Sequence, residues 1–417
     1  MMRSQGITGP SYKIIHGTTK ESHILKLQAM KGPMELSHDI FPRVQPNFYS
    51  WMNLYGKNFL TWAGPQPHMV ITEPELAKEI LSNKDGTFPK IKINGHVKKL
   101  LGDGLGIAEG PKWLKLRKLA NHAFYAESLK EMIPAMIASV ETMLENWKQK
   151  IWKTRDDIES DKIEQSLRDS VLAIVSKREE KVITGQAHNF GSDFLGSLLR
   201  VHHDADKKNR ISIDDVIDEC KVFFLAGHET TSSLLSWTFL LLAIHTDWQE
   251  KARKEVFELF GQDNPTAEGL PRLKIASMII NEALRLYTPA ISLVRRVTKN
   301  VKVGKYEFPA NMELHIPPLA LHRNQEIWGK DAHLFKPERF SEGVATATKN
   351  NPMAFLPFGF GPRTCVGLNF ANNEVKIAMS IILQRYKFTL SPNYVHSPLS
   401  LITVRPQNGV QIMLQTL

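Results

Sequence analysis

The hydrophobic and polar residues of this chain follow a helical period over most of its length. This spacing predicts helices at residues 73–83, 126–150, 155–181, 212–244, 247–260, 271–286 and 368–386. Ser212 and Asp215 are spaced as a capping box at the start of the longest helix, and Gly261 follows the next one as a C-terminal stop. The polar stretch 185–209 is predicted to be a loop. Helix therefore dominates the predicted structure.

A period of two appears only in short stretches, which predict small β-sheets. "FLTWAG" and "HMVIT" flank the turn-forming "PQP" and predict a hairpin at residues 59–72. After Pro289 the same period returns in "VKVGKYEF" and "MELHI", and "LITV" and "VQIML" close the chain. The fold class predicted from these patterns is mainly α with small β-sheets.

Composition narrows the class of protein. The 417 residues are 42% hydrophobic and 23% charged, as in globular proteins, and the net charge is +10. The scattered basic residues indicate either a solvated surface or docking to an acidic partner or an anionic membrane face. No basic motif interleaved with aromatic residues occurs, which argues against nucleic acid as a partner. Two cysteines exclude a disulfide framework and indicate a reducing compartment.

Neither a signal peptide nor a membrane span is expected in this chain. The longest apolar run, "LLSWTFLLLAI", is shorter than the ~20 residues that a spanning helix needs, and it is predicted to be a buried helix. The opening "MMRSQGITGPSYK" has no hydrophobic segment after its basic residue.

One cysteine lies in the glycine-rich stretch "FGFGPRTCVG", residues 358–367. A lone cysteine is ordinarily a small buried hydrophobe. Here Arg363 and the start of a predicted helix both favour the thiolate of Cys365. Glycines also let the backbone approach a large flat ligand and point N–H groups at the sulfur. A thiolate stabilised in this way is better suited to bind a metal than to attack a substrate.

A second unusual stretch, "AGHETTSS", lies inside the longest predicted helix. Gly227 costs about 1 kcal/mol there relative to alanine, and the threonines that follow can bond to carbonyls one turn earlier. Either a packing kink or a functional groove would explain the pattern. A zinc-protease motif is excluded, because Ser232 stands where H-E-x-x-H requires its second histidine.

Two pairs of residues are spaced to share a helix face. Glu282 and Arg285 lie at i, i+3, and an exposed pair of this kind contributes at most ~1 kcal/mol. Trp113 and Arg117 lie four apart. The spacing of the second pair indicates an amphipathic helix with a snorkelling arginine.

The pattern Phe358-x-x-Gly361-x-Arg363-x-Cys365-x-Gly367 resembles the haem-thiolate loop of the cytochrome P450 family. "AGHETTSS", "NEALRLYTP" with "PERF", and W-x-x-x-R resemble further motifs of that family in the expected order. "GITGPSYKIIHG" and "LRLYTPAISLVRR" resemble its plant branch known as clan 72. The resemblance covers nearly the whole chain and implies a single cytochrome P450 domain over residues 1–417, although an incomplete one.

Residue roles follow from this resemblance. Cys365 would bind the iron of haem b (iron protoporphyrin IX), and Glu229 and Thr230 would be the acid–alcohol pair that delivers protons to dioxygen. The haem propionates would be bound by Trp113, Arg117, Arg296 and Arg363. The buried structural triad would be Glu282, Arg285 and Arg339, and His322 is assigned structural value only.

The resemblance also implies the reaction and its partners. A monooxygenase would hydroxylate a hydrophobic small molecule of the terpenoid, gibberellin-like or fatty-acid class, in plant secondary metabolism. It would use O2 and electrons from an NADPH-dependent flavoprotein reductase. Its expected location is the cytosolic face of the endoplasmic reticulum membrane, with contact to the membrane surface.

Two departures from the family pattern stand out. The N-terminal membrane anchor and proline-rich hinge of plant members are not seen, and at Lys150–Ile151 "LENWKQK" runs directly into "IWKTRDDIESDKIEQSL". Several helices, including one that roofs the substrate pocket, are therefore expected to be missing, as in an exon-skipped or truncated form. Two alternatives stay open: a catalytically impaired or non-functional haem-binding isoform, and a haem-thiolate enzyme that catalyses rearrangement or dehydration without a reductase.

Overall fold

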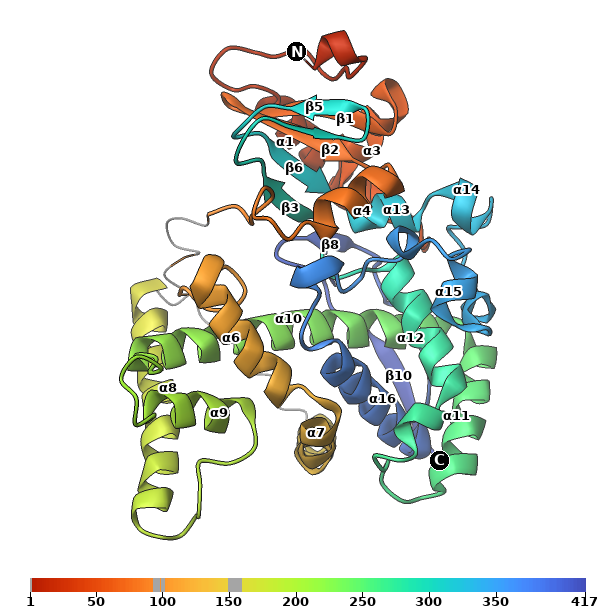
Figure 1. Cartoon of the computed structure of the whole chain (residues 1–417). Helices are drawn as coiled ribbons and strands as arrows, with labels where there is room; N and C mark the ends of the chain where they lie inside the picture. The colour runs from red at the N-terminus through yellow and green to blue at the C-terminus, as the bar shows by residue number, and fades with distance from the viewer. Residues whose placement is uncertain (1, 93–97, 99–101, 149–159) are drawn as a thin grey trace. The chain divides into compact units, whose positions relative to one another are not determined.

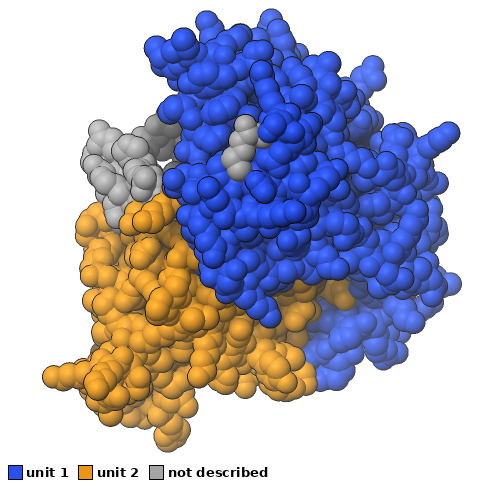
Figure 2. Space-filling view, turned by 45° about the horizontal axis from the view of Figure 1, so that its top comes forward, with its two compact units in different colours: residues 1–91, 229–365, 379–417 blue, residues 92–228, 366–378 orange. Residues whose placement is uncertain are grey.

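The computed structural model describes residues 2–92, 98, 102–148 and 160–417 (Figure 1). Helices dominate these residues and the sheets are small, which confirms the predicted fold class. The chain divides into two compact units (Figure 2). The first unit comprises Met1–Ile91, Glu229–Cys365 and Met379–Leu417, and the second comprises Lys92–His228 and Val366–Ala378. The Lys150–Ile151 junction lies outside the described residues.

The first unit contains all the strands that the structure describes, together with many short helices. Its strands are β1 (Asn58–Ala63), β2 (Gln66–Ile71), β3 (Leu293–Arg296), β4 (Val301–Val303), β5 (Tyr306–Phe308), β6 (Glu313–Ile316), β7 (Tyr386–Leu390), β8 (Pro398–Ser400), β9 (Val404–Pro406) and β10 (Ile412–Thr416). Its α-helices are α1 (Thr19–Ala29), α2 (Phe41–Val44), α3 (Pro46–Tyr55), α4 (Pro74–Ser82), α11 (Thr246–Phe260), α12 (Lys274–Leu286), α13 (Pro318–His322), α14 (Gln325–Trp328) and α15 (Gly343–Ala347). Its 3₁₀ helices are η1 (Arg3–Gln5), η2 (Leu270–Arg272), η3 (Pro337–Phe340), η4 (Pro352–Ala354) and η5 (Gly361–Arg363).

The second unit is helical. It contains α6 (Gly110–Ala123), α7 (Ala126–Lys148), α8 (Ser160–Ile183) and α9 (Phe194–His202). Two further helices, α10 (Ile213–Ile244) and α16 (Leu368–Arg385), have residues in both units. The predicted capping box at the start of α10 is confirmed, because the Asp215 N–H donates to the Ser212 hydroxyl and the Ser212 N–H donates to the Asp215 carboxylate, both at 3.0 Å.

The largest sheet of the first unit joins strands that are far apart in the sequence. Its order is β1-β2-β6-β3, in which β2 and β6 are parallel and the other neighbours are antiparallel (Figure 1). The β1–β2 pair is the hairpin predicted from the "PQP" turn. The register places Met69 beside Leu314 and His68 beside Glu313. Because neighbouring residues of a strand point to opposite faces, these two pairs lie on different faces of the sheet.

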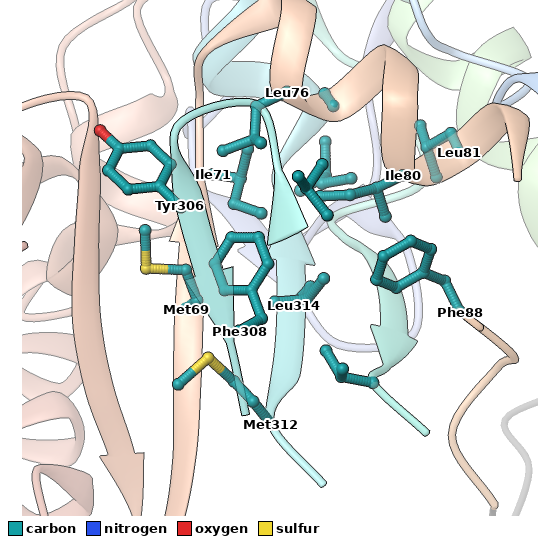
Figure 3. Close-up of a cluster of buried hydrophobic side chains, with 14 of the residues drawn as sticks. Met69, Ile71, Leu76, Ile80, Leu81, Phe88, Tyr306, Phe308, Met312 and Leu314 are labelled. Carbon is teal, nitrogen blue, oxygen red and sulfur yellow. The ribbon is translucent and has the colours of Figure 1, made fainter. Parts of the chain in front are cut away.

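One face of this sheet carries the main apolar core of the first unit (Figure 3). Met69 and Leu314 are fully buried there, and the amphipathic helix α4 supplies Ile80 and Leu81. Each fully buried side chain of this kind stabilises the fold by roughly 1.5–3 kcal/mol. We call this group of side chains the sheet core. It fixes the position of α4, on which the candidate site depends.

Some boundaries differ from those predicted. The stretch 185–209, predicted to be a loop, contains α9, which is capped by the Asp193 carboxylate accepting the Gly196 N–H at 2.8 Å. Leu198 and Leu199 of this helix are fully buried. The helix predicted to begin at Pro271 instead begins at Lys274, because Pro271 belongs to η2. Of the strand predicted at "LITV", only Val404 belongs to a strand, β9, because residues 401–403 form the turn between β8 and β9.

The apolar run in the C-terminal half of α10 forms a buried helix, as predicted. Leu234, Trp237 and Leu240 are at most 2% exposed. Among the described residues, no helix combines the length and the apolar character that crossing a bilayer requires.

Candidate active site

The loop that carries Cys365 is closed by its own backbone in the first unit. The Cys365 N–H donates to the Phe358 carbonyl at 2.9 Å. Inside this closure the Gly361 carbonyl accepts both the N–H of Thr364, at 3.0 Å, and its hydroxyl, at 2.8 Å. The side chain of Cys365 is exposed. The loop therefore presents the sulfur outward from a backbone that is already constrained.

Glycine is required at one position of this loop because helix α4 lies against it. Gly361 has φ +74°, and a Cβ atom there would lie 2.2 Å from the carbonyl oxygen of Leu81. A side chain at this position would meet both backbone strain and a backbone clash. The sheet core therefore positions the Cys365 loop through the last turn of α4.

His322 ties the start of this loop to helix α12. Its Nε2 accepts the N–H of Leu356 at 2.9 Å, so its Nδ1 carries the proton and donates to the Arg285 carbonyl at 3.2 Å. Burial lowers the pKa of His322 from 6.5 to about 3, and the nearby Arg285 charge acts in the same direction. The neutral ring therefore links two segments that are 34 and 37 residues away from it in the sequence.

The predicted triad residues lie together in the interior of the first unit. Arg285 contacts the fully buried Glu282 through two hydrogen bonds, Nη2 to Oε1 at 2.6 Å and Nε to Oε2 at 2.7 Å. Arg339 Nε lies 3.6 Å from the same Oε1. Arg285 also donates to the carbonyls of His322 and Ala332, at 3.0 and 2.6 Å. The buried pair is thus fully hydrogen-bonded, which is what makes a buried charge tolerable.

Arg296 ends strand β3, which lies beside the Cys365 loop. The Cβ position of Gly359 in that loop is 3.9 Å from Leu293, the first residue of the strand. Arg296 donates from Nη2 to Glu313 Oε1 at 2.5 Å, whereas its buried Nε has no hydrogen-bond partner among the described residues. A guanidinium with one unused, buried donor fits a carboxylate supplied by a bound cofactor.

Glu229 and Thr230 occupy consecutive, half-buried positions of α10, which runs without a break through the "AGHETTSS" stretch. The "AGHETTSS" stretch, for which the sequence suggested a packing kink, therefore does not interrupt the helix. No described atom lies within 4 Å of the position that a Cβ at Gly227 would take. A side chain at this position would therefore meet no described atom.

Trp113 and Arg117 lie in the second unit, both half-buried on α6. Trp113 packs on a small apolar cluster that includes Leu105 and Leu116. The segment before α6 is fixed to α10 by two carboxylates. Glu219 Oε1 accepts the Leu105 N–H at 2.6 Å, and Asp218 accepts the N–H of Asp103 at 2.8 Å.

Sequence reasoning missed Glu219. Its side chain is fully buried, and burial raises its pKa from 4.5 to about 7, against the opposing effect of the Leu105 N–H. Its second oxygen has no hydrogen-bond partner among the described residues. The sequence around Glu219 does not predict this contact, because its partner Leu105 is 114 residues away in the chain.

The structure thus distributes the predicted site residues over both units. Cys365, Arg363, Arg296, Glu229 and Thr230 belong to the first unit, as do the triad residues, which contact one another. Trp113 and Arg117 belong to the second unit.

Comparison with known proteins identifies the family. The cytochrome P450 family model matches residues 43–161 and 150–413. Cytochrome P450 CYP749A22 of Panax ginseng is 50% identical over 478 aligned positions, which cover the whole chain and 91% of that relative. The 11-oxo-beta-amyrin 30-oxidase of Glycyrrhiza uralensis is 37% identical and secologanin synthase 1 of Catharanthus roseus 36% identical, each over the whole chain and 92% of the relative. The chain therefore belongs to the cytochrome P450 family as a plant member, a haem-dependent monooxygenase that acts on a hydrophobic small molecule with O2 and a redox partner.

Proposed function

We propose that this monooxygenase hydroxylates a terpenoid, with haem b as its cofactor and an NADPH-dependent flavoprotein reductase as its electron donor. The names of two relatives refer to 11-oxo-beta-amyrin and to secologanin, which supports the terpenoid class over gibberellin-like or fatty-acid substrates. The net charge of +10 supports docking to an acidic reductase surface, since complementary charge accelerates association.

The observation that carries this proposal is the geometry of the Cys365 loop. A loop closed on its own backbone, with an exposed cysteine and an obligatory glycine against α4, supports Cys365 as the residue that would bind the haem iron. The Cys365 thiolate would donate electron density to the iron, and haem would supply the chemistry that cleaves the O–O bond of O2. The unused Nε of Arg296 supports a propionate contact, and Arg363, Trp113 and Arg117 are proposed to share that role.

Protons would come from the protein. The Glu229 carboxyl and the Thr230 hydroxyl are proposed to deliver the protons that O2 reduction consumes, from the stretch of α10 next to the open position at Gly227. The intact acid–alcohol pair favours oxygenation over rearrangement or dehydration without a reductase. Glu282, Arg285 and Arg339 are proposed to be structural, and His322 to position the Cys365 loop through Leu356.

We further propose that residues 1–417 form one cytochrome P450 domain from which an internal segment is missing near Lys150–Ile151. Three observations support this. The family model matches in two pieces that meet at residues 150–161, and 478 aligned positions against 417 residues leave 61 positions of the ginseng relative without a counterpart. Apolar side chains of the second unit are also exposed, including Phe224 at 65% and Leu114 at 62%.

These same observations favour a second candidate, a catalytically impaired or non-functional haem-binding isoform. Without the segment that roofs the substrate pocket, water would enter the site. By family resemblance, the proposed location is the cytosolic face of the endoplasmic reticulum membrane.

The reduced, carbon-monoxide-bound absorption spectrum of the purified chain tests the proposal. We expect a thiolate-type Soret band in the natural chain and in Cys220→Ser, which removes the other cysteine, and its loss in Cys365→Ser. Retention of the band in Cys365→Ser would refute the assigned ligand. A chain that binds haem but gives no product with reductase, NADPH and terpenoid substrates would favour the second candidate.

A further inference from the structure

A group of metal-binding side chains lies on the first unit's main sheet, on the face opposite the sheet core. His68 is on β2, and Glu313 and His315 are on β6. Met69 and Leu314 alternate with them and point into the sheet core (Figure 3). The alternation of strand residues therefore places all three potential ligands on one face.

The backbone register brings the three ligand atoms together. His68 and Glu313 are direct partners across the parallel pair, and His315 is the next residue of β6 on the same face. Glu313 Oε2 lies 3.2 Å from His68 Nε2 and 3.8 Å from His315 Nε2. The two imidazole rings stack with their centroids 4.6 Å apart. Both histidines thus direct the same nitrogen toward one carboxylate oxygen.

A fourth residue orients that carboxylate. Arg296, the register partner of Glu313 on β3, binds the other oxygen, Oε1, at 2.5 Å. Oε2 is therefore left turned toward the histidines, as when an outer partner orients a metal ligand. His315 Nε2 is buried and has no hydrogen-bond partner among the described residues, and Phe48 of α3 covers its ring at 6.4 Å. A buried ring nitrogen that faces a carboxylate oxygen at 3.8 Å without a hydrogen bond is unusual unless something lies between the two.

We propose that His68, Glu313 and His315 bind one divalent transition-metal ion, with Zn²⁺ the best match. Two imidazole nitrogens and one carboxylate oxygen are ligands that Zn²⁺ takes at ~2.0–2.2 Å, leaving a fourth position for water. The three ligand atoms lie within 4.8 Å of one another, so small side-chain rotations close the site. The ion would join β2 to β6 at the position where β6 pairs with Arg296.

A second group in the chain provides a control. Glu179, His202 and His203 also approach one another, in the second unit. Here the side chain of His203 is 47% exposed and its Nε2 already contacts Glu179 Oε1 at 2.8 Å. No strand register fixes these residues, so we expect this surface group to bind zinc weakly.

Equilibrium dialysis of the untagged, haem-loaded chain tests the proposal. After removal of metals with a chelator, the protein is dialysed against micromolar Zn²⁺ with excess Mg²⁺, and bound zinc is measured by mass spectrometry. We expect one tight equivalent per chain in the natural protein and in the control His203→Asn. His68→Asn and His315→Asn should weaken binding by at least about 10-fold. No bound zinc, or an undiminished equivalent in His315→Asn, would overturn the proposal.

A second test uses only the natural chain, so its result does not depend on whether these variants fold. Histidines are labelled with diethyl pyrocarbonate with and without Zn²⁺ and located by peptide mass spectrometry. Protection of His68 and His315, with His203 labelled equally in both samples, supports the site. Equal labelling of His68 and His315 in both samples refutes it.

Discussion

The two units support their parts of the candidate site with different chemistry. In the first unit the Cys365 loop is braced by a buried ion pair, by a neutral histidine and by backbone contact with α4. In the second unit the segment before α6 depends on carboxylates of α10, of which Glu219 is fully buried and has a raised pKa. The hydrogen-bonded ion pair of the first unit keeps its charges near neutral pH. The second unit, in contrast, loses stability when the Glu219 carboxyl ionises.

The largest expected effect breaks the first unit's ion pair. Glu282→Ala leaves Arg285 charged and buried, so we expect the free energy of unfolding to fall by about 3–5 kcal/mol. Asp247→Ala is the control, because Asp247 pairs with Lys251 at i, i+4 and both side chains are more than half exposed, at 64% and 53%. It should cost at most about 1 kcal/mol. Denaturant unfolding measures both, and equal losses would contradict the assigned difference in burial.

The second effect concerns Glu219. Its folded-state pKa of about 7 exceeds the ordinary value of 4.5, so its contribution to stability is complete below pH 4.5 and is lost as the pH rises through 7. The loss is at most about 3 kcal/mol. Hydrogen exchange at Leu105, corrected for intrinsic rates, should be less protected at pH 8 than at pH 5. Glu219→Gln should remove this dependence, and an unchanged pH profile would show that Glu219 is not its source.

The stability of the first unit should show the opposite pH dependence, because of His322. Its folded-state pKa, about 3, lies below 6.5, so the stability it contributes is present above pH 6.5 and is lost as the pH falls toward 3. Amides of the 356–365 stretch should therefore lose protection on acidification, while that of Leu105 should not lose protection between pH 7 and 5. If both segments responded to pH in the same direction, the contrast between the units would fail.

The last prediction sharpens the account of the Cys365 loop. Gly361→Ala should combine left-handed strain of roughly 1–2 kcal/mol with the clash against Leu81. Gly6→Ala is the control, since Gly6 has φ +78° but no described atom within 4 Å of its Cβ position. We expect lower haem occupancy and stability in Gly361→Ala than in Gly6→Ala, by absorbance and thermal unfolding. Equal haem occupancy and equal stability of the two variants would contradict the role assigned to the α4 contact.

Local signals in the sequence predicted much of this fold. The hairpin at residues 59–72, the capping box at Ser212 and the buried end of α10 each depend on residues close together in the chain, and each is confirmed. Helix α9 was missed because its Asp193 cap and two buried leucines lie within a polar stretch. Its apolar face is defined by packing partners outside the segment.

The contacts that position the site could not be predicted in the same way. The Leu105–Glu219 and Leu356–His322 bonds join residues 114 and 34 apart, and no residue type at either end identifies its partner. The pairing of Arg296 with Glu313 depends on strand register, which only the assembled sheet defines. The roles of Cys365 and the residues around it came from family motifs and remain predictions.

The contact between Gly361 and Leu81 has a consequence for which length changes the chain can accept. Adding one residue within α4 would turn its last carbonyls by about 100° and advance them by about 1.5 Å, so a different group would meet the glycine. Natural or engineered insertions in this part of the chain should therefore be tolerated in the turn between β1 and β2, and rejected between Pro74 and Leu81. Helix α4 acts as a spacer of fixed length for the sulfur-bearing loop.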